Sequence, residues 1–133
     1  MQSLKYTRWW LIGGAALLAF DVIGSVFWVP GGVSLAQDND KVVHATVYFI
    51  LMFWFAGILK PHNYLQLAAG LVAVGGSLEV FQYTAHARSP ELMDLAANIV
   101  GIGVAWLVAR LGMHRWCQWV ERFFRSQNKQ VTH

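Results

Sequence analysis

Four long runs of apolar residues alternate with short polar segments along this chain. The runs cover residues 9–29, 42–59, 64–83 and 92–111, and each is close to the roughly 20 residues that a membrane-spanning helix needs. Residues 112–133 form a tail in which Trp116–Phe124 is aromatic and basic, a composition typical of a helix at a membrane surface. The pattern predicts an all-α protein: a bundle of four transmembrane helices with a short amphipathic C-terminal helix that frays after Phe124.

The ends of the runs carry residues that start or stop helices. Pro30-Gly31-Gly32 ends the first run, and Ser89-Pro90-Glu91 offers an N-cap, a proline and an acid at the start of the fourth. Within the fourth run, small residues recur at every fourth position, at Ala97, Gly101, Ala105 and Ala109. Such rows let helices approach closely in lipid, so we expect this helix to be central and packed rather than lipid-facing.

Composition narrows the class of protein. The 133 residues allow a single domain, and 56% of them are hydrophobic whereas only 13% are charged, about half the usual share in soluble domains. The net charge of +3 is not arranged as a basic stripe, so we expect no nucleic-acid partner. A single cysteine, Cys117, excludes an intramolecular disulfide and is interpreted as a small filler.

The basic residues predict the orientation in the membrane. The N-terminus, the second loop and the tail together carry eight of them, whereas the first and third loops carry only Lys41 and Arg88. The positive-inside rule therefore places both termini in the cytoplasm. Ser34-Leu35-Ala36 resembles a signal-peptide cleavage site, but the first run is longer than a usual signal-peptide core. The tryptophans near the predicted interfaces are interpreted as membrane anchors: Trp9, Trp10, Trp28, Trp116 and Trp119.

Polar residues gather at the predicted outer ends of the helices. Helical spacing puts Lys41, His44 and Tyr48 on one face, Glu79 and Gln82 on another, and Asp94 and Asn98 on a third. Asp40 and Arg88 flank the same end. An ionisable residue inside a span costs roughly 2.5–3.5 kcal/mol, whereas a polar interhelical contact returns only about 0.6 kcal/mol. These values favour a functional site over scaffolding.

Each residue type indicates a role in that site. Arg88, assisted by Lys41, is suited to binding an anion such as phosphate or carboxylate, although an ion pair of Arg88 with a nearby acid and a solvated Lys41 are the structural alternatives. Glu79, Asp94 and His44 are the candidates for proton transfer, with a capping or core histidine as the alternative for His44. We expect the remaining polar residues to line the substrate: Asp40, Gln82, Asn98 and Tyr48.

Asp21, in the outer half of the first run, needs a partner or a wet cavity, and Lys41 or Arg88 is expected to supply it. A metal site made of His44, Glu79 and Asp94 is chemically feasible, but no zinc-binding spacing is present. The sequence therefore predicts neither a metal nor another cofactor, and the known catalytic signatures are missing from it.

The order and spacing of these polar residues resemble the VanZ-like family. The motifs are Asp40-Lys41-x-x-His44-x-x-x-Tyr48, Glu79-x-x-Gln82, Arg88-Ser89 and Asp94-x-x-x-Asn98-x-x-Gly101, which together lie within residues 9–111. Ala45 stands where the family often has phenylalanine. The resemblance implies a small bacterial inner-membrane protein of the cell envelope, associated with teicoplanin resistance in the founding member, and it implies no established reaction.

Three hypotheses follow from the sequence. The first is a site on the outer face that binds or modifies an anionic envelope lipid or a lipid-linked cell-wall precursor. The second is a small proton-coupled transporter that works as an oligomer, with Glu79 as the switch. The third is a non-enzymatic scaffold or regulator of envelope machinery, in which the polar residues hold the helices together. Enzymatic activity and oligomeric state are both left open.

Overall fold

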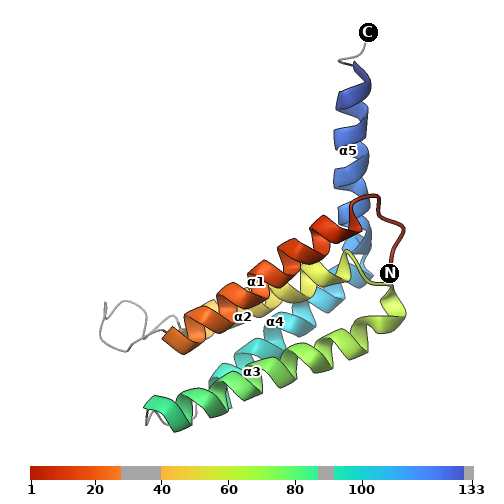
Figure 1. The fold of residues 1–133 in the computed structure, drawn as a ribbon. Coiled ribbons are helices and arrows are strands. Elements are labelled where there is room, and N and C mark those ends of the chain that lie inside the picture. The colour runs from red at the N-terminus through yellow and green to blue at the C-terminus, as the bar shows by residue number, and fades with distance from the viewer. Residues whose placement is uncertain (28–39, 87–91, 131–133) are drawn as a thin grey trace.

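The computed structural model describes residues 1–27, 40–86 and 92–130 (Figure 1). Its α-helices are α1 (Thr7–Phe27), α2 (Asp40–Ala56), α3 (Tyr64–His86), α4 (Leu92–Arg110) and α5 (Trp116–Gln130). Short 3-10 helices, Pro61–Asn63 and Met113–Arg115, precede α3 and α5. No strand occurs in the described ranges, so the predicted all-helical class is confirmed.

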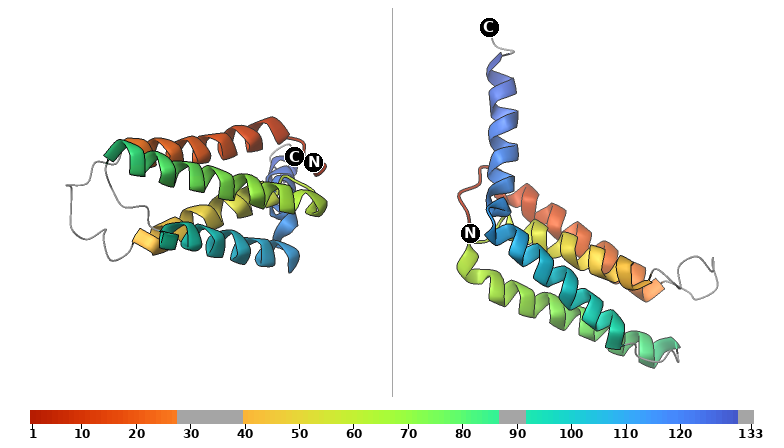
Figure 2. Two further views of the ribbon diagram at one scale, coloured as in Figure 1. Left: turned by 90° about the horizontal axis from the view of Figure 1, so that it is seen from below. Right: turned by 180° about the vertical axis from the view of Figure 1, so that it is seen from behind.

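The first four helices lie side by side, and α5 leaves them at a steep angle (Figure 1). Seen from below, α1 and α3 form one layer and α2 and α4 form the other (Figure 2). We call the end that holds the last turns of α1 and α3 and the first turns of α2 and α4 the distal end. The opposite end, next to α5 and the N-terminus, is the proximal end.

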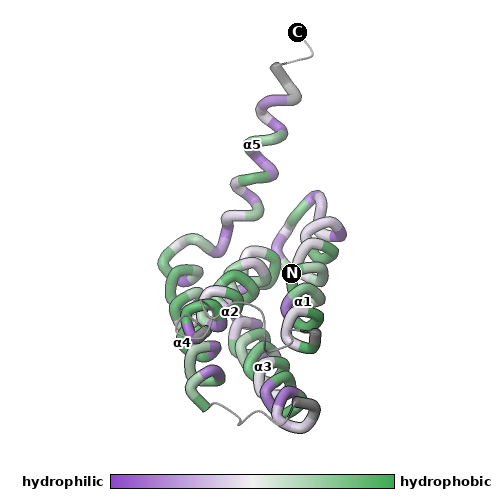
Figure 3. The backbone as a smooth tube through the Cα atoms, turned by 90° about the vertical axis from the view of Figure 1, so that its left-hand side faces the viewer, coloured by the Kyte–Doolittle hydropathy of each residue, from purple (hydrophilic) through white to green (hydrophobic). Residues whose placement is uncertain are grey.

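The predicted helix limits differ from the observed ones by a few residues at most, except in the tail. Helix α1 runs from Thr7 to Phe27 rather than from 9 to 29, and α2 ends at Ala56. Helix α5 continues to Gln130, so the expected fraying after Phe124 is wrong. Its hydrophilic and hydrophobic residues alternate in short stretches, whereas the bundle helices are mainly hydrophobic (Figure 3). Pro30 and the segment Ser89-Pro90-Glu91 lie outside the described residues.

The closest helix pair is α2 with α4, and small residues make it possible. Gly101, Ala105 and Ala109 are buried along α4, and a Cβ added at Gly101 would collide with the carbonyl oxygen of Ala45 in α2. The two backbones therefore touch at this point, as the small-residue row predicts. The opposite face of α4 is nevertheless open, with four large apolar side chains exposed: Ile99, Val100, Val104 and Leu107. This side of α4 is therefore not packed against the described part of the chain, so the expectation of a fully packed helix is wrong for it.

The hydrophobic core lies mainly between α2, α3 and α4. Its buried members come from these three helices: Tyr48, Leu51, Met52, Ala56, Tyr64, Ala68, Leu71, Ile102, Ala105 and Ala109. Helix α1 packs against this core only through partly buried side chains such as Leu17 and Leu18. Burial of apolar area thus holds α2 and α4 together. These two helices carry most of the predicted site.

Three helices are long and apolar enough to cross a membrane. The segments are Thr7–Val26, Pro61–Thr84 and Leu92–Arg110, and the apolar part of α2, Lys41–Ala56, is shorter. Large apolar side chains cover the outside of the bundle, including Phe20, which is 80% exposed, and Leu65. Such a surface is suited to lipid rather than to water. Length and composition therefore indicate a membrane protein with three candidate spans.

Candidate functional site

Three ionisable side chains from three helices meet near the distal end. His44 of α2, Glu79 of α3 and Asp94 of α4 each offer one nitrogen or oxygen atom, and these atoms all lie within 4.8 Å of one another. Asp94 is only 3% exposed, whereas His44 and Glu79 are half-buried. We call these three residues the distal triad. They are the three residues that the sequence nominates for proton transfer.

A second polar layer lies one helical turn deeper in the bundle. Tyr48 and Asn98 follow His44 and Asp94 by four residues, and each is only 1% exposed. Gly75 precedes Glu79 by four residues on α3, and a Cβ added there would lie 2.9 Å from both the Tyr48 hydroxyl and Asn98 Nδ2. The glycine therefore leaves the space in which these two side chains meet. Sequence analysis missed Gly75, although its spacing from Glu79 places it on the same helical face.

Helix α1 adds a fourth ionisable group to this region. Asp21 is near enough to Tyr48 and His44 of α2 to interact with them electrostatically, although one of its carboxylate oxygens and the Tyr48 hydroxyl are buried without a hydrogen-bond partner among the described residues. The expectation that Lys41 or Arg88 partners Asp21 stays a prediction, because Arg88 lies outside the described residues. All four bundle helices therefore contribute polar groups to one region: Asp21, His44, Tyr48, Glu79, Asp94 and Asn98. We call these six residues the distal cluster.

The other residues predicted for the site have different places. Gln82 donates a hydrogen bond of 2.9 Å from Nε2 to the carbonyl oxygen of Ser25, so it ties α3 to α1. Lys41 is exposed on the first turn of α2. Asp40 is the first residue of α2, and its side chain lies outside the described part of the molecule, as does the whole of Arg88.

Acidic groups outnumber basic ones within the distal cluster, and Lys41 precedes His44 by three residues on α2. Three carboxylates, at Asp21, Glu79 and Asp94, stand beside the single imidazole of His44. Buried charges of one sign are costly in a low-dielectric interior unless protons or cations neutralise them. The cluster is therefore suited to holding protons or a cation. It is also suited to pairing with basic side chains that bind an anionic ligand at the same time.

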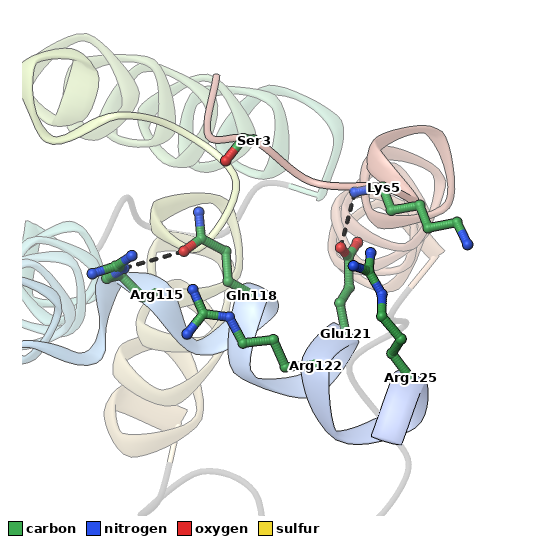
Figure 4. A pocket seen from close by; sticks show the side chains of 7 residues that line it. All are labelled: Ser3, Lys5, Arg115, Gln118, Glu121, Arg122 and Arg125. Carbon is green, nitrogen blue, oxygen red and sulfur yellow. Dashed lines mark hydrogen bonds between the residues drawn. The ribbon is translucent and has the colours of Figure 1, made fainter. Parts of the chain in front are cut away.

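A second polar region lies at the proximal end, where the N-terminal segment meets α5. It surrounds a shallow pocket lined by Ser3, Lys5, Arg115, Gln118, Glu121, Arg122 and Arg125 (Figure 4). Glu121 accepts hydrogen bonds from the backbone N–H groups of Lys5 (2.9 Å) and Tyr6 (3.0 Å) and from the indole of Trp10 (2.9 Å). Partial burial opposes the effect, but these bonds hold the pKa of Glu121 below its ordinary value.

The same end is fastened by Gln2 and by aromatic rings. The Gln2 amide donates hydrogen bonds to the carbonyl oxygens of Ala56, Leu59 and His114. The ring centroids of Trp10 and Trp116 lie 5.2 Å apart, and both rings contact Trp54. Trp10 and Trp116 are partly exposed as well as packed against each other, so their interpretation as lipid anchors stays a prediction.

Trp9 and Trp119 are exposed, as anchors would be, and Trp28 lies outside the described residues. Cys117 is fully buried against Gly57, and burial raises the pKa of its thiol to about 12. A thiol with that pKa stays protonated at neutral pH, which agrees with its interpretation as a filler.

No family model, no curated protein and no solved structure matches this chain. An imidazole and two carboxylates on three different helices can exchange protons, bind a cation, or hold the helices together.

Proposed function

We propose that this chain is a bacterial inner-membrane protein whose distal end binds the headgroup of an anionic envelope lipid or lipid-linked cell-wall precursor. The observation that carries the proposal is the convergence of His44, Glu79 and Asp94 from three helices at one end of an otherwise apolar bundle. Polar groups buried in a membrane bundle at the cost of desolvation usually serve binding or chemistry.

The proposed membrane arrangement has four spans with both termini in the cytoplasm. Helices α1 and α3 both run from the proximal to the distal end (Figure 1), so the chain must return between them, and α2 is the segment that returns. Seventeen residues of α-helix cover about 25 Å, nearly the thickness of the hydrocarbon core. The excess of basic residues in the N-terminus, the second loop and the tail then places the proximal end inside.

In this arrangement α5 lies along the cytoplasmic surface. The bundle crosses the membrane and α5 leaves it at a steep angle (Figure 1), so the helix axis runs near the plane of the bilayer. Phe123 and Phe124 are exposed on it, and Arg122 and Arg125 extend around the pocket (Figure 4). Aromatic and basic residues on one surface helix suit the headgroups of anionic lipids.

Positive charge for the distal ligand would come from Lys41 and Arg88. Lys41 is exposed at the start of α2, and Arg88 belongs to the segment that connects α3 to α4. A guanidinium binds phosphate or carboxylate through two parallel hydrogen bonds. Glu79, Asp94 and His44 would manage protons if the bound headgroup is modified. Membership of the VanZ-like family is proposed on the same residues, together with the association with glycopeptide resistance that it implies.

Transport through the bundle is less well supported by the described residues. Proximal to Tyr48 and Asn98, the described core consists of apolar side chains such as Met52, Leu71 and Ala105. A proton path would need polar groups or water along that length. The distal cluster therefore fits a site that is open to one side of the membrane better than a path across it.

The experiment is native mass spectrometry of the lipids and envelope precursors that remain bound after purification. Wild type is compared with Arg88→Ala and with a matched control, Arg8→Ala, an exposed arginine near the proximal end. We expect Arg88→Ala to lose one class of anionic headgroup while Arg8→Ala keeps it. Equal retention by all three folded proteins would contradict the proposal and favour the scaffold hypothesis.

A further inference from the structure

The distal triad has the composition of a metal site. One imidazole nitrogen and two carboxylate oxygens lie within 4.8 Å of one another, on three helices whose packing fixes them. We propose that His44, Glu79 and Asp94 bind one divalent transition-metal ion of the zinc and manganese class. This proposal does not depend on the lipid ligand, because the binding of an ion can be measured without one.

Charge supports the proposal. A neutral imidazole and two carboxylates carry a charge of −2, and a divalent ion brings the triad to zero. A neutral complex costs far less in a membrane interior than two carboxylates do separately. Bound metal would also turn an acidic region into one that accepts an anionic headgroup, with Asp21 one helix away as a remaining acid.

A buried amide directly beneath the triad points to a ligand. Asn98 is 1% exposed, and its Oδ1 has no hydrogen-bond partner among the described residues. Its Nδ2 atom and the Tyr48 hydroxyl, which is also buried without a hydrogen-bond partner in the described part of the chain, both approach Gly75 one turn below the triad. Outer-shell oxygens of this kind accept hydrogen bonds from metal-bound water and orient the ligands. Leaving such an oxygen unsatisfied costs free energy, so a polar occupant at this level would recover it.

The helices are held in a way that suits a preformed site. Gly101 of α4 touches the backbone of α2 at Ala45, the residue next to His44. This contact fixes the distance between the α2 and α4 ligands before any ion binds. Preorganised ligands lose little conformational entropy on binding.

The ligand set defines the class of metal. One nitrogen and two oxygen donors suit zinc, manganese or iron(II), whereas calcium and magnesium prefer oxygen alone. The absence of a zinc spacing in the sequence does not count against this site. Spacing motifs mark ligands on one segment, and here each ligand comes from a different helix.

The experiment measures zinc binding to the full chain in lipid nanodiscs, prepared without a polyhistidine tag and treated with a chelator. Isothermal titration gives stoichiometry and affinity, and cobalt substituted for zinc gives an absorption spectrum that reports the coordination. The variants are His44→Gln, Glu79→Gln and the outer-shell change Asn98→Leu. The control is His62→Gln, an exposed histidine at the proximal end. Circular dichroism and gel filtration confirm that each variant is folded.

We expect one zinc ion per chain in wild type and in His62→Gln. Asn98→Leu should weaken the affinity by about 10–100-fold, and the two ligand variants by about 100-fold or more. The cobalt spectrum should change in the ligand variants only. Wild type that binds no stoichiometric zinc, or binds it as well as the folded ligand variants do, would overturn the proposal and leave the triad as an ion-pair network. Headgroup retention is a separate measurement, so either proposal can fail alone.

Discussion

The two ends of the bundle use polar residues in different ways. At the proximal end, Gln2 and Glu121 form hydrogen bonds with backbone groups at chain and helix ends, which lack partners inside a helix. At the distal end, Glu79 and Asn98 lie within helices whose backbone is already satisfied, and they face other side chains instead. The proximal residues thus complete the backbone hydrogen bonding of the fold, whereas the distal residues are the ones that we propose to bind a ligand.

Charge and exposure follow the same division. The proximal pocket is rich in arginine and open to solvent (Figure 4), whereas the distal cluster is rich in carboxylates and largely buried. Exposed charges are screened and contribute little to stability, but buried charges must be compensated. Substitutions at the two ends should therefore have different consequences.

The largest loss of stability is expected from a substitution at the contact of α4 with α2. Gly101→Ala places a methyl group against the Ala45 carbonyl, and backbone cannot rotate away as a side chain can. We expect a loss of about 3 kcal/mol in the free energy of unfolding. Gly103→Ala is the matched control, since a Cβ there meets nothing within 4 Å, and it should be neutral or up to about 1 kcal/mol more stable. Equal effects in a denaturant titration would contradict the close helix contact.

A smaller change tests the deeper polar layer alone. In Gly75→Ala the new methyl meets the ends of two side chains, Tyr48 and Asn98, which can shift by a few tenths of an ångström. We expect a loss of about 1–2 kcal/mol together with weaker ligand binding at the distal end. Gly76→Ala has open space around its Cβ and should leave both properties unchanged. The free energy of unfolding and the ligand affinity are measured on both variants. The comparison separates an effect on the Tyr48 and Asn98 layer from the general effect of alanine on the helix.

At the proximal end, the effect of Glu121→Gln should depend on pH. Hydrogen bonds from Lys5, Tyr6 and Trp10 lower the pKa of Glu121 below 4.5, so its carboxylate stabilises the folded state above that pH. The contribution is lost as pH falls through the lowered pKa. Because the group is partly exposed, we expect wild type to exceed the variant by only about 1 kcal/mol at pH 7. A difference that does not shrink as the pH falls below 4.5 would show that the charge is not responsible.

The smallest effect on stability belongs to the arginines of α5. Arg122→Gln with Arg125→Gln should change unfolding by less than about 0.5 kcal/mol, because both side chains are exposed. The double variant should instead loosen the tail from anionic bilayers, by about 1 kcal/mol for each arginine.

A spin label at Ser126→Cys measures this loosening in nanodiscs, because the buried Cys117 has a pKa near 12 and stays unlabelled. The label should be immobile with anionic lipid in wild type and mobile in the double variant or in high salt. Mobility that is independent of lipid charge would remove the proposed surface helix.

Much of the fold could be predicted because it follows from helical periodicity and apolar length. The helices follow from the apolar runs, and the small-residue row of α4 follows from its four-residue spacing. The meeting of His44, Glu79 and Asp94 follows from the alternating direction of successive helices. The layering of α1 with α3 could not be predicted, since several arrangements bury the same faces.

The proximal network was missed for a different reason. Gln2 and Glu121 act on backbone groups far away in the sequence, and no periodic pattern reports such contacts. Trp10 and Trp116 look like interfacial residues by position, and only tertiary packing turns them towards Trp54. Sequence patterns reveal which residues share a helical face. The same patterns do not reveal which end of the chain folds back onto that helix.

The central claim is that the distal triad is a binding site and not a clamp between helices. The direct test is the free energy of unfolding of a variant with all three residues neutralised, His44→Gln, Glu79→Gln and Asp94→Asn, measured on chelator-treated protein. Replacing a whole buried ionic group by neutral side chains is often neutral or stabilising by about 1–4 kcal/mol. We therefore predict a variant at least as stable as wild type that no longer retains the anionic headgroup. A loss of about 3 kcal/mol or more would show instead that the triad holds the bundle together.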